Sequence, residues 1–131
     1  MSKVNIKQIG NGWCVASAGK LTGMLEKTFV KDDMGLTSME ISFGSLSEGQ
    51  AVPFNHKHKQ NEEVYIVLGG KGVFIVDGTE VEVEAGDIVR MAPQVVRCNK
   101  NTGSEPFTYI CMQAKDNSLE QYVMSDAEIV E

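Results

Sequence analysis

The chain of 131 residues is short enough for one domain, and its formal net charge of −6 argues against a nucleic-acid partner, because phosphate-tracking surfaces need clustered lysine and arginine. Its cysteines, Cys14, Cys98 and Cys111, are odd in number and lack paired spacing, so neither a disulfide framework nor a structural zinc site is predicted. The sequence has no apolar signal core and no apolar run long enough to span a membrane, so we expect a cytoplasmic protein without a membrane partner.

Residues 1–35 show the weakest periodicity of the chain. We expect them to form a strand and loops that lie against the main domain, either within the subunit or exchanged with a partner subunit. Small β domains expose the edges of their sheets, and pairing or exchange of this strand would cover them. We therefore expect a homodimer.

From residue 37 onward the dominant period is two, which is typical of strands. Short runs rich in β-branched and aromatic residues predict strands at 37–43, 63–68, 73–76, 80–83, 88–91 and 107–113. Asp77-Gly78 between two of these runs predicts a tight hairpin, because this pair readily adopts positive φ angles. Near the end of the chain, Ser125 and Glu128 have the spacing of a capping box, which predicts a short helix.

Alternation also predicts which side chains share a face. If Glu63 points inward, Tyr65 and Val67 lie on the same side of their strand. Met39, Ile41 and Phe43 form one face of the first predicted strand and could line the interior. The last strand carries the more polar face of Tyr109, Cys111 and Gln113, and its direction is open.

The segment before the strand at 63–68 carries both histidines of the chain, His56 and His58. In an extended segment alternate side chains project the same way, so the two imidazoles could bind one ion. A polar loop that happens to carry both histidines is the alternative for the pair alone. The residues that follow, including Glu62 and Glu63, favour the metal interpretation.

The stretch from Gly49 to Gly70 resembles the first signature of the cupin superfamily, which runs glycine, five residues, H-x-H, three or four residues, glutamate, six residues and glycine. The pattern matches twice, through Glu62 with Gly69 or through Glu63 with Gly70. We favour Glu63, because the ligand glutamate of the resembling proteins directly precedes an apolar strand.

The stretch from Gly86 to Asn101 is similar to the second cupin signature, which runs glycine, five residues, P-x-G, two residues, histidine, three residues and asparagine. Pro93 stands one place late here, and Gln94 replaces the second glycine. The last ligand position of the family, a histidine, is Arg97 in this chain.

The resemblance implies an all-β fold, the double-stranded β-helix of the cupin jelly-roll barrel, in one domain spanning residues 1–131. The barrel core would cover about residues 36–115. Residues 1–35 would supply the N-terminal strand and loops, and residues 116–131 a C-terminal tail with the short helix.

The resemblance also implies a ligand set for a divalent metal, made of His56, His58 and Glu63. Two imidazoles and one carboxylate suit iron, manganese, nickel or zinc. Arg97 cannot be a fourth ligand because its guanidinium stays protonated. At about 5 Å it would repel a divalent ion by roughly 6 to 7 kcal/mol at an effective dielectric of 20, so a site without metal is an open alternative.

Three roles for Arg97 are open. It could pair with Glu63 or Glu62 in place of an ion, or it could bind the carboxylate or other oxyanion of a substrate, together with a hydrogen bond from Tyr65. A register slip at Pro93 would instead turn Arg97 outward and Cys98 inward.

The sequence therefore predicts a small-molecule-binding cupin with a divalent metal, acting on a small anionic substrate as a dioxygenase, isomerase or lyase. The alternative is a metal-free ligand-binding or sensor module with a Glu–Arg salt bridge at the metal position. A cupin fold serves many reactions, so no catalytic residue can be assigned from it.

Overall fold

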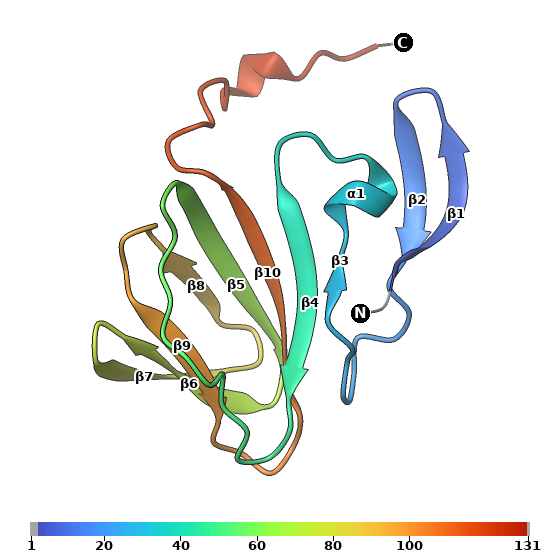
Figure 1. Ribbon diagram of the computed structural model, residues 1–131. Helices are drawn as coiled ribbons and strands as arrows, with labels where there is room; N and C mark the ends of the chain where they lie inside the picture. Colours follow the sequence, from blue (N-terminus) through green and yellow to red (C-terminus); the bar gives the residue numbers. More distant parts are fainter. Residues whose placement is uncertain (1–2, 131) are drawn as a thin grey trace.

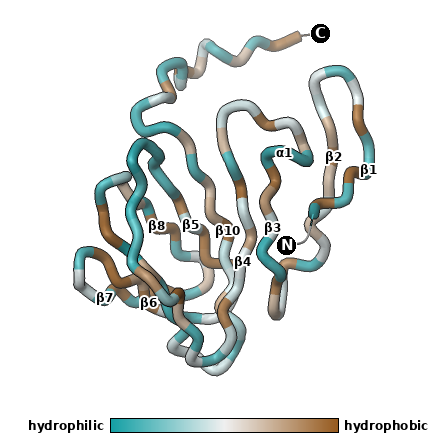
Figure 2. Tube along the Cα trace, in the orientation of Figure 1, coloured by the Kyte–Doolittle hydropathy of each residue, from teal (hydrophilic) through white to brown (hydrophobic). Residues whose placement is uncertain are grey.

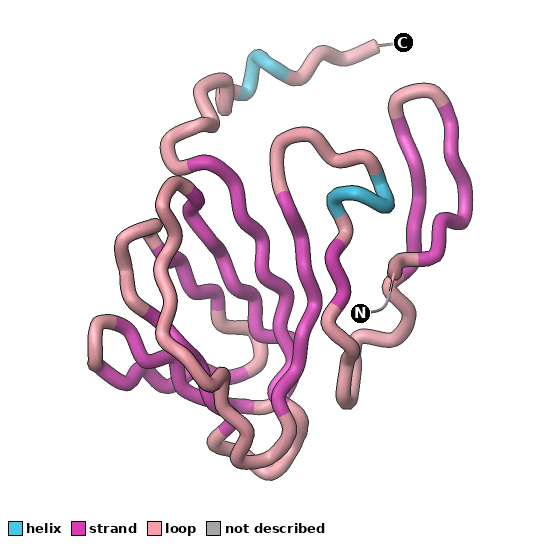
Figure 3. The backbone as a smooth tube through the Cα atoms, in the orientation of Figure 1, coloured by secondary structure: helices cyan, strands magenta, loops and turns pink. Residues whose placement is uncertain are grey.

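The computed structural model describes residues 3–130, which are mainly strands joined by short loops (Figures 1 and 3). The strands are β1 (Asn5–Gly10), β2 (Trp13–Ser17), β3 (Thr28–Phe29), β4 (Glu40–Leu46), β5 (Asn61–Gly69), β6 (Lys71–Val76), β7 (Thr79–Glu84), β8 (Ile88–Met91), β9 (Arg97–Asn101) and β10 (Phe107–Lys115). The helical elements are α1 (Lys31–Met34) and the 3₁₀ turn η1 (Met124–Asp126). The prediction of an all-β fold is confirmed, and α1 is an element that the sequence did not predict.

Two sheets form the barrel. The larger has five strands in the order β3-β4-β10-β5-β8, and the smaller has three in the order β7-β6-β9. All pairs are antiparallel, and β10 lies between β4 and β5 although it is far from both in the sequence. This placement closes the jelly-roll around one interior (Figure 1).

Alternation along β5 holds as predicted, because Glu63, Tyr65 and Val67 are buried while the residues between them are only partly buried. Tyr109 and Cys111 of β10 also face the interior. The core cluster consists of Leu46, Tyr65, Val67, Phe74, Val83, Met91, Phe107, Tyr109 and Cys111. In Figure 2 the strands mix hydrophobic and hydrophilic residues, whereas the segment directly before β5 is hydrophilic.

The prediction for β4 was wrong about its face. Ser42, Gly44 and Leu46 are the buried residues of this strand, instead of the apolar residues at 39, 41 and 43. A cause is the neighbouring strand, because the ring of Tyr109 lies 3.4 Å from where a side chain at Gly44 would begin. Small residues on β4 leave room for that ring.

The predicted hairpin between β6 and β7 is confirmed. Asp77 has φ 48° and Gly78 has φ 85°, and the flanking residues Val76 and Thr79 pair across the turn. Two successive positive φ angles are the requirement of a type I′ turn, which matches the twist of the strands.

The N-terminal region differs from the predicted strand and loops on the barrel. β1 and β2 pair with each other as a separate two-stranded sheet, which stands beside α1 in Figure 1. Within residues 3–35, β3, a two-residue strand paired with β4, is the strand that joins the barrel. Met1 and Ser2 of the predicted N-terminal segment lie outside the described residues.

The chain after β10 leaves the barrel. The capping-box prediction was wrong about where the helical turn begins and how it is capped. The turn begins at Met124, its N-cap residue is Val123, and no side chain caps it. Glu131 lies outside the described residues. Among the helices of residues 3–130, none is long and apolar enough to cross a membrane.

Candidate metal centre

The two histidines are placed by backbone hydrogen bonds to the start of β9. His56 and Arg97 form an antiparallel bridge, in which His56 N donates to Arg97 O at 3.0 Å and Arg97 N donates to His56 O at 2.9 Å. Farther along, His58 N donates to Pro93 O at 2.9 Å. Residues opposite each other in an antiparallel pair project to the same side, so His56 and Arg97 face one centre.

Glu63 reaches the same centre from β5, where it lies between Gln113 of β10 and Met91 of β8. One ligand atom each from His56, His58 and Glu63 lies within 4.8 Å of the others. The imidazole rings stand nearly perpendicular, with centroids 5.4 Å apart. The structure therefore brings together the three residues that the sequence predicts as metal ligands.

The imidazoles have free nitrogen atoms inside the protein. His56 Nδ1 and His58 Nε2 are buried and have no hydrogen-bond partner. His58 Nε2 lies 3.3 Å from Glu63 Oε2, but the geometry is not that of a hydrogen bond. Burial and the nearby Arg97 charge lower the pKa of His56 below its usual value, which keeps a lone pair available for a metal.

Glu63 is 4% exposed and takes hydrogen bonds at both carboxylate oxygens. Oε1 accepts from Arg97 Nη2 at 2.7 Å and from Tyr65 Oη at 3.1 Å, and Oε2 accepts from Cys111 Sγ at 3.3 Å. Burial opposes its ionisation, but the hydrogen bonds from Arg97 and Cys111 and the charge of Arg97 hold its pKa below the usual value. Glu63 is therefore an ionised carboxylate inside the barrel.

Arg97 is 1% exposed and points inward. Its Nη1 donates to the carbonyl oxygen of Val95 at 2.7 Å, with Ala92 O at 3.3 Å and Pro93 O at 3.4 Å. The alternative with Arg97 outside and Cys98 inside is wrong, since Cys98 is only partly buried and Arg97 meets Glu63. The loop before β9 thus forms a carbonyl cradle for the guanidinium.

Glu62 takes no part in this cluster. Its carboxylate is bonded by Arg90 of β8, and both side chains are partly exposed. The choice of Glu63 over Glu62, as the glutamate that directly precedes the apolar strand, therefore agrees with the geometry. Cys111 is a member of the cluster whose direction the sequence left open, because the polarity of its face did not decide whether that face turns inward.

The donor set fits a divalent ion. Ligands at about 2.0 to 2.2 Å from one ion lie at most roughly 4.4 Å apart, so the observed cluster needs only a small contraction. Oε2 of Glu63 faces His58, and its one hydrogen-bond donor is a weak thiol. Oε1 is held by Arg97 and Tyr65, so the carboxylate charge stands between the guanidinium and the imidazoles.

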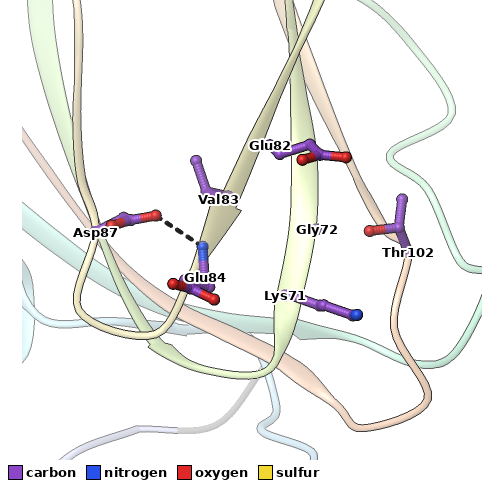
Figure 4. Close-up of a pocket in the computed structure, with 7 residues that line it drawn as sticks. All are labelled: Lys71, Gly72, Glu82, Val83, Glu84, Asp87 and Thr102. Carbon is purple, nitrogen blue, oxygen red and sulfur yellow. Dashed lines mark hydrogen bonds between the residues drawn. The ribbon is translucent and has the colours of Figure 1, made fainter.

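Three surface cavities lie away from this cluster, with volumes of about 530, 300 and 640 Å³. The first is lined by Glu82, Glu84 and Asp87 with Lys71 and Thr102, and Figure 4 shows that Asp87 caps the backbone N–H of Glu84 there. The third lies between the β1–β2 hairpin and residues 34–39. None of the three is lined by the predicted ligands.

The similarity of this chain to known proteins centres on the barrel. The sequence model of a family described as the cupin domain matches residues 43–113. A crystal structure of a cupin protein from Bacteroides fragilis superposes with a TM-score of 0.78 and 40% sequence identity, over 81% of this chain and 90% of that one. The fit extends beyond the matched domain to most of both chains.

Two curated relatives are similar over part of their length. An uncharacterized protein of Methanocaldococcus jannaschii is 33% identical over 76 residues, which are 58% of this chain and 57% of the relative. Glucose-6-phosphate isomerase of Pyrococcus abyssi is 33% identical over 66 residues, 47% of this chain and 35% of the relative. The chain thus matches between about a third and somewhat more than half of these proteins.

Proposed function

This chain belongs to the cupin domain family, and from that premise we propose that it binds a divalent metal ion through His56, His58 and Glu63. One observation carries the proposal. His56 and His58 each have a buried nitrogen without a hydrogen-bond partner, and one ligand atom from each of them and from Glu63 lies within 4.8 Å of the others. Buried polar atoms are rarely left without partners, so unpaired nitrogens on two side chains that face each other indicate a missing ligand.

The neighbours of Glu63 would orient it toward the ion. Arg97 and Tyr65 fix Oε1, so Oε2 is turned toward the histidines. Such outer contacts are common around metal-binding carboxylates and limit their rotation. A divalent ion held here would polarise an oxygen atom of a bound molecule. The contact of Arg97 and Tyr65 with a ligand stays a prediction, because the hydrogen bonds described for these side chains go to protein atoms.

We further propose that the ligand is a small anion. A cationic guanidinium lies behind the carboxylate, and a divalent ion would add two positive charges to a cluster that holds one carboxylate. A negatively charged ligand would restore the balance. The relative from Pyrococcus abyssi is named for a phosphorylated sugar, which supports the same ligand class here.

A metal-free binding module is the second candidate, and the ion pair between Arg97 and Glu63 at 2.7 Å favours it. In that case the guanidinium replaces the ion as the charge partner of Glu63. The unpartnered nitrogens of both histidines are left unexplained by this candidate, so the metal-binding function is the better supported.

Elemental analysis of protein purified without an affinity tag, and titration with iron(II), manganese, nickel and zinc, would test the metal site. We expect His56→Ala and His58→Ala to lose most of the bound metal, and Glu63→Gln to follow. Glu62→Gln is the matched control and should bind metal as the wild type does, because its carboxylate pairs with Arg90.

The two candidates give opposite results. If the wild type binds none of the four metals and its thermal stability is unchanged by a chelator, the metal-free module is supported instead. If Glu62→Gln and Glu63→Gln lose metal equally, the assignment of Glu63 as the ligand is wrong. Circular dichroism of each variant shows whether the barrel has kept its fold.

A further inference from the structure

Lys27 is an exposed residue at the β3 edge of the larger sheet. It directly precedes β3, in which Phe29 pairs with Ser42 of β4. Because alternate residues of a strand share a face, Lys27 lies on the side of Phe29, and residues opposite each other in an antiparallel pair share a side. Ser42 is buried on the interior side of β4, so the Lys27 side chain points toward the barrel interior from the sheet edge.

The ammonium group of Lys27 is held near that interior but has no acidic partner. Its Nζ donates to Ser42 Oγ at 3.4 Å, a long hydrogen bond, and lies 5.2 Å from the centroid of the Phe29 ring. Within residues 3–130, no carboxylate oxygen lies within ion-pair distance of this amine. A lysine placed this way keeps donor capacity for a further oxygen atom.

A short chain of contacts connects Lys27 to the metal centre. Ser42 pairs across the sheet with Cys111, and Cys111 Sγ donates to Glu63 Oε2 at 3.3 Å. Lys27 is thus linked to Glu63 through its contact with Ser42, the pairing of Ser42 with Cys111, and the thiol hydrogen bond of Cys111.

Arg97, a second cation of this cluster, already uses both of its Nη groups. Arg97 is 1% exposed and bonds Glu63 and the carbonyl oxygens before β9. Lys27 is exposed, flexible and carries a compact charge. An oxyanion could therefore bind this ammonium without breaking the buried ion pair between Arg97 and Glu63.

We propose that Lys27 binds an oxyanion of the ligand, either a phosphate or a carboxylate group, at the open side of the metal centre. This inference rests on the proposed function, because the oxyanion is the part of a small anionic ligand that would lie next to the ion. Ser42 positions the amine through its hydroxyl, and Phe29 supports it from the side. Lys27 thereby selects negatively charged ligands over neutral ones.

Calorimetric titration of manganese-loaded protein with inorganic phosphate, and separately with oxalate, tests the proposal. We expect Lys27→Met to weaken binding of at least one of the two anions by about tenfold or more, the size expected for losing a hydrogen bond to a charged group. Lys27→Arg keeps the charge and should bind within about threefold of the wild type. Lys57→Met is the control, because it removes the same charge from an exposed position beside the histidines.

The two anions separate the sources of the oxyanion. A loss confined to phosphate identifies a phosphate ligand, and a loss confined to oxalate identifies a carboxylate. If Lys27→Met binds both anions as the wild type does, or if Lys57→Met weakens binding equally, Lys27 has no specific role and the proposal is overturned.

Failure of the proposed function would look different. Lys27→Met should not lower the affinity for manganese, because removing a nearby positive charge does not disfavour a cation. If the wild type binds no metal, the same anion titrations on metal-free wild type and Lys27→Met still decide the role of Lys27. Weaker anion binding by Lys27→Met than by the wild type then supports the role of Lys27. Equal binding by the two proteins, or no binding by either, overturns it.

Discussion

At the scale of single residues, the barrel interior contains an ion pair between Glu63 and Arg97. Both side chains are almost fully buried, and each is the charge partner of the other. A buried ion pair gives little net stability compared with apolar residues, but an unpaired buried charge is very costly. The pair therefore matters most when one member is removed.

We expect Arg97→Met to lower the free energy of unfolding by about 3 to 5 kcal/mol in chelator-treated protein, because it leaves the Glu63 carboxylate buried without its partner. The double variant Glu63→Gln/Arg97→Met should lose less than the sum of the two single variants. Urea unfolding of the four proteins gives this coupling energy. An Arg97→Met cost below about 1 kcal/mol would show that the carboxylate is relieved in another way, by protonation or by solvent.

The sequence predicts part of this residue-scale arrangement. The cupin signature, with the apolar strand that directly follows Glu63, is sufficient to choose Glu63 over Glu62, and strand alternation then places Tyr65 on the same side. The surroundings of Arg97 could not be predicted, because they consist of backbone carbonyls at Ala92, Pro93 and Val95 whose direction depends on the loop conformation. Side-chain patterns carry no information about such groups.

At the scale of elements, the turn between β5 and β6 explains the last glycine of the first signature. Gly70 has φ 75°, which favours glycine, and a side chain there would also meet the carbonyl oxygen of Pro106. Gly78 in the β6–β7 hairpin has φ 85°, but nothing lies within 4 Å of where its side chain would begin. The two positions share a backbone requirement and differ in their surroundings.

We therefore expect Gly78→Ala to lower the free energy of unfolding by about 1 to 2 kcal/mol, the cost of a left-handed conformation for an ordinary residue. Gly70→Ala should cost clearly more, because the added methyl group also forces the segment at Pro106 to move. Urea denaturation of both variants measures the difference. Equal costs would mean that this segment moves aside freely, and that the conformation alone accounts for the glycine.

Most barrel strands follow from their period-two patterns, and β8 begins and ends at the predicted residues. β9 was not predicted, because its sequence RCNKN has no apolar alternation. It is a strand because it pairs with β6, which also has β7 on its other side. The sequence also did not predict β1 and β2 as two paired strands, since exposed strands lack the alternation that burial imposes.

At the scale of the whole molecule, the N-terminal hairpin of β1 and β2 joins neither sheet of the barrel. β1 and β2 pair only with each other, and Ile9 is 75% exposed while Trp13 is 52% exposed. Isolated two-stranded hairpins are marginally stable in water. A hairpin that carries exposed apolar side chains gains stability when another surface covers it.

The expected homodimer stays a prediction, and the hairpin is where we expect the second copy to pack. Light scattering at about ten micromolar should give twice the mass of one chain. Ile9→Glu should shift the mass toward the monomer, because the interface would bury an unpaired charge. Ile88→Glu, on the exposed edge strand β8, is the control and should leave the mass unchanged. A monomeric wild type, or equal effects of both variants, would contradict this interface.

The bridge between His56 and Arg97 joins two segments that lie about forty residues apart in the chain. Together with the bond from His58 to Pro93, it is what brings the histidines within reach of Glu63. A metal bound by all three side chains would be a reversible crosslink between the segment before β5 and the barrel wall. By mass action the bound metal would disfavour every local opening that separates the two segments. Metal occupancy would therefore set how often this end of the barrel opens while the rest stays folded.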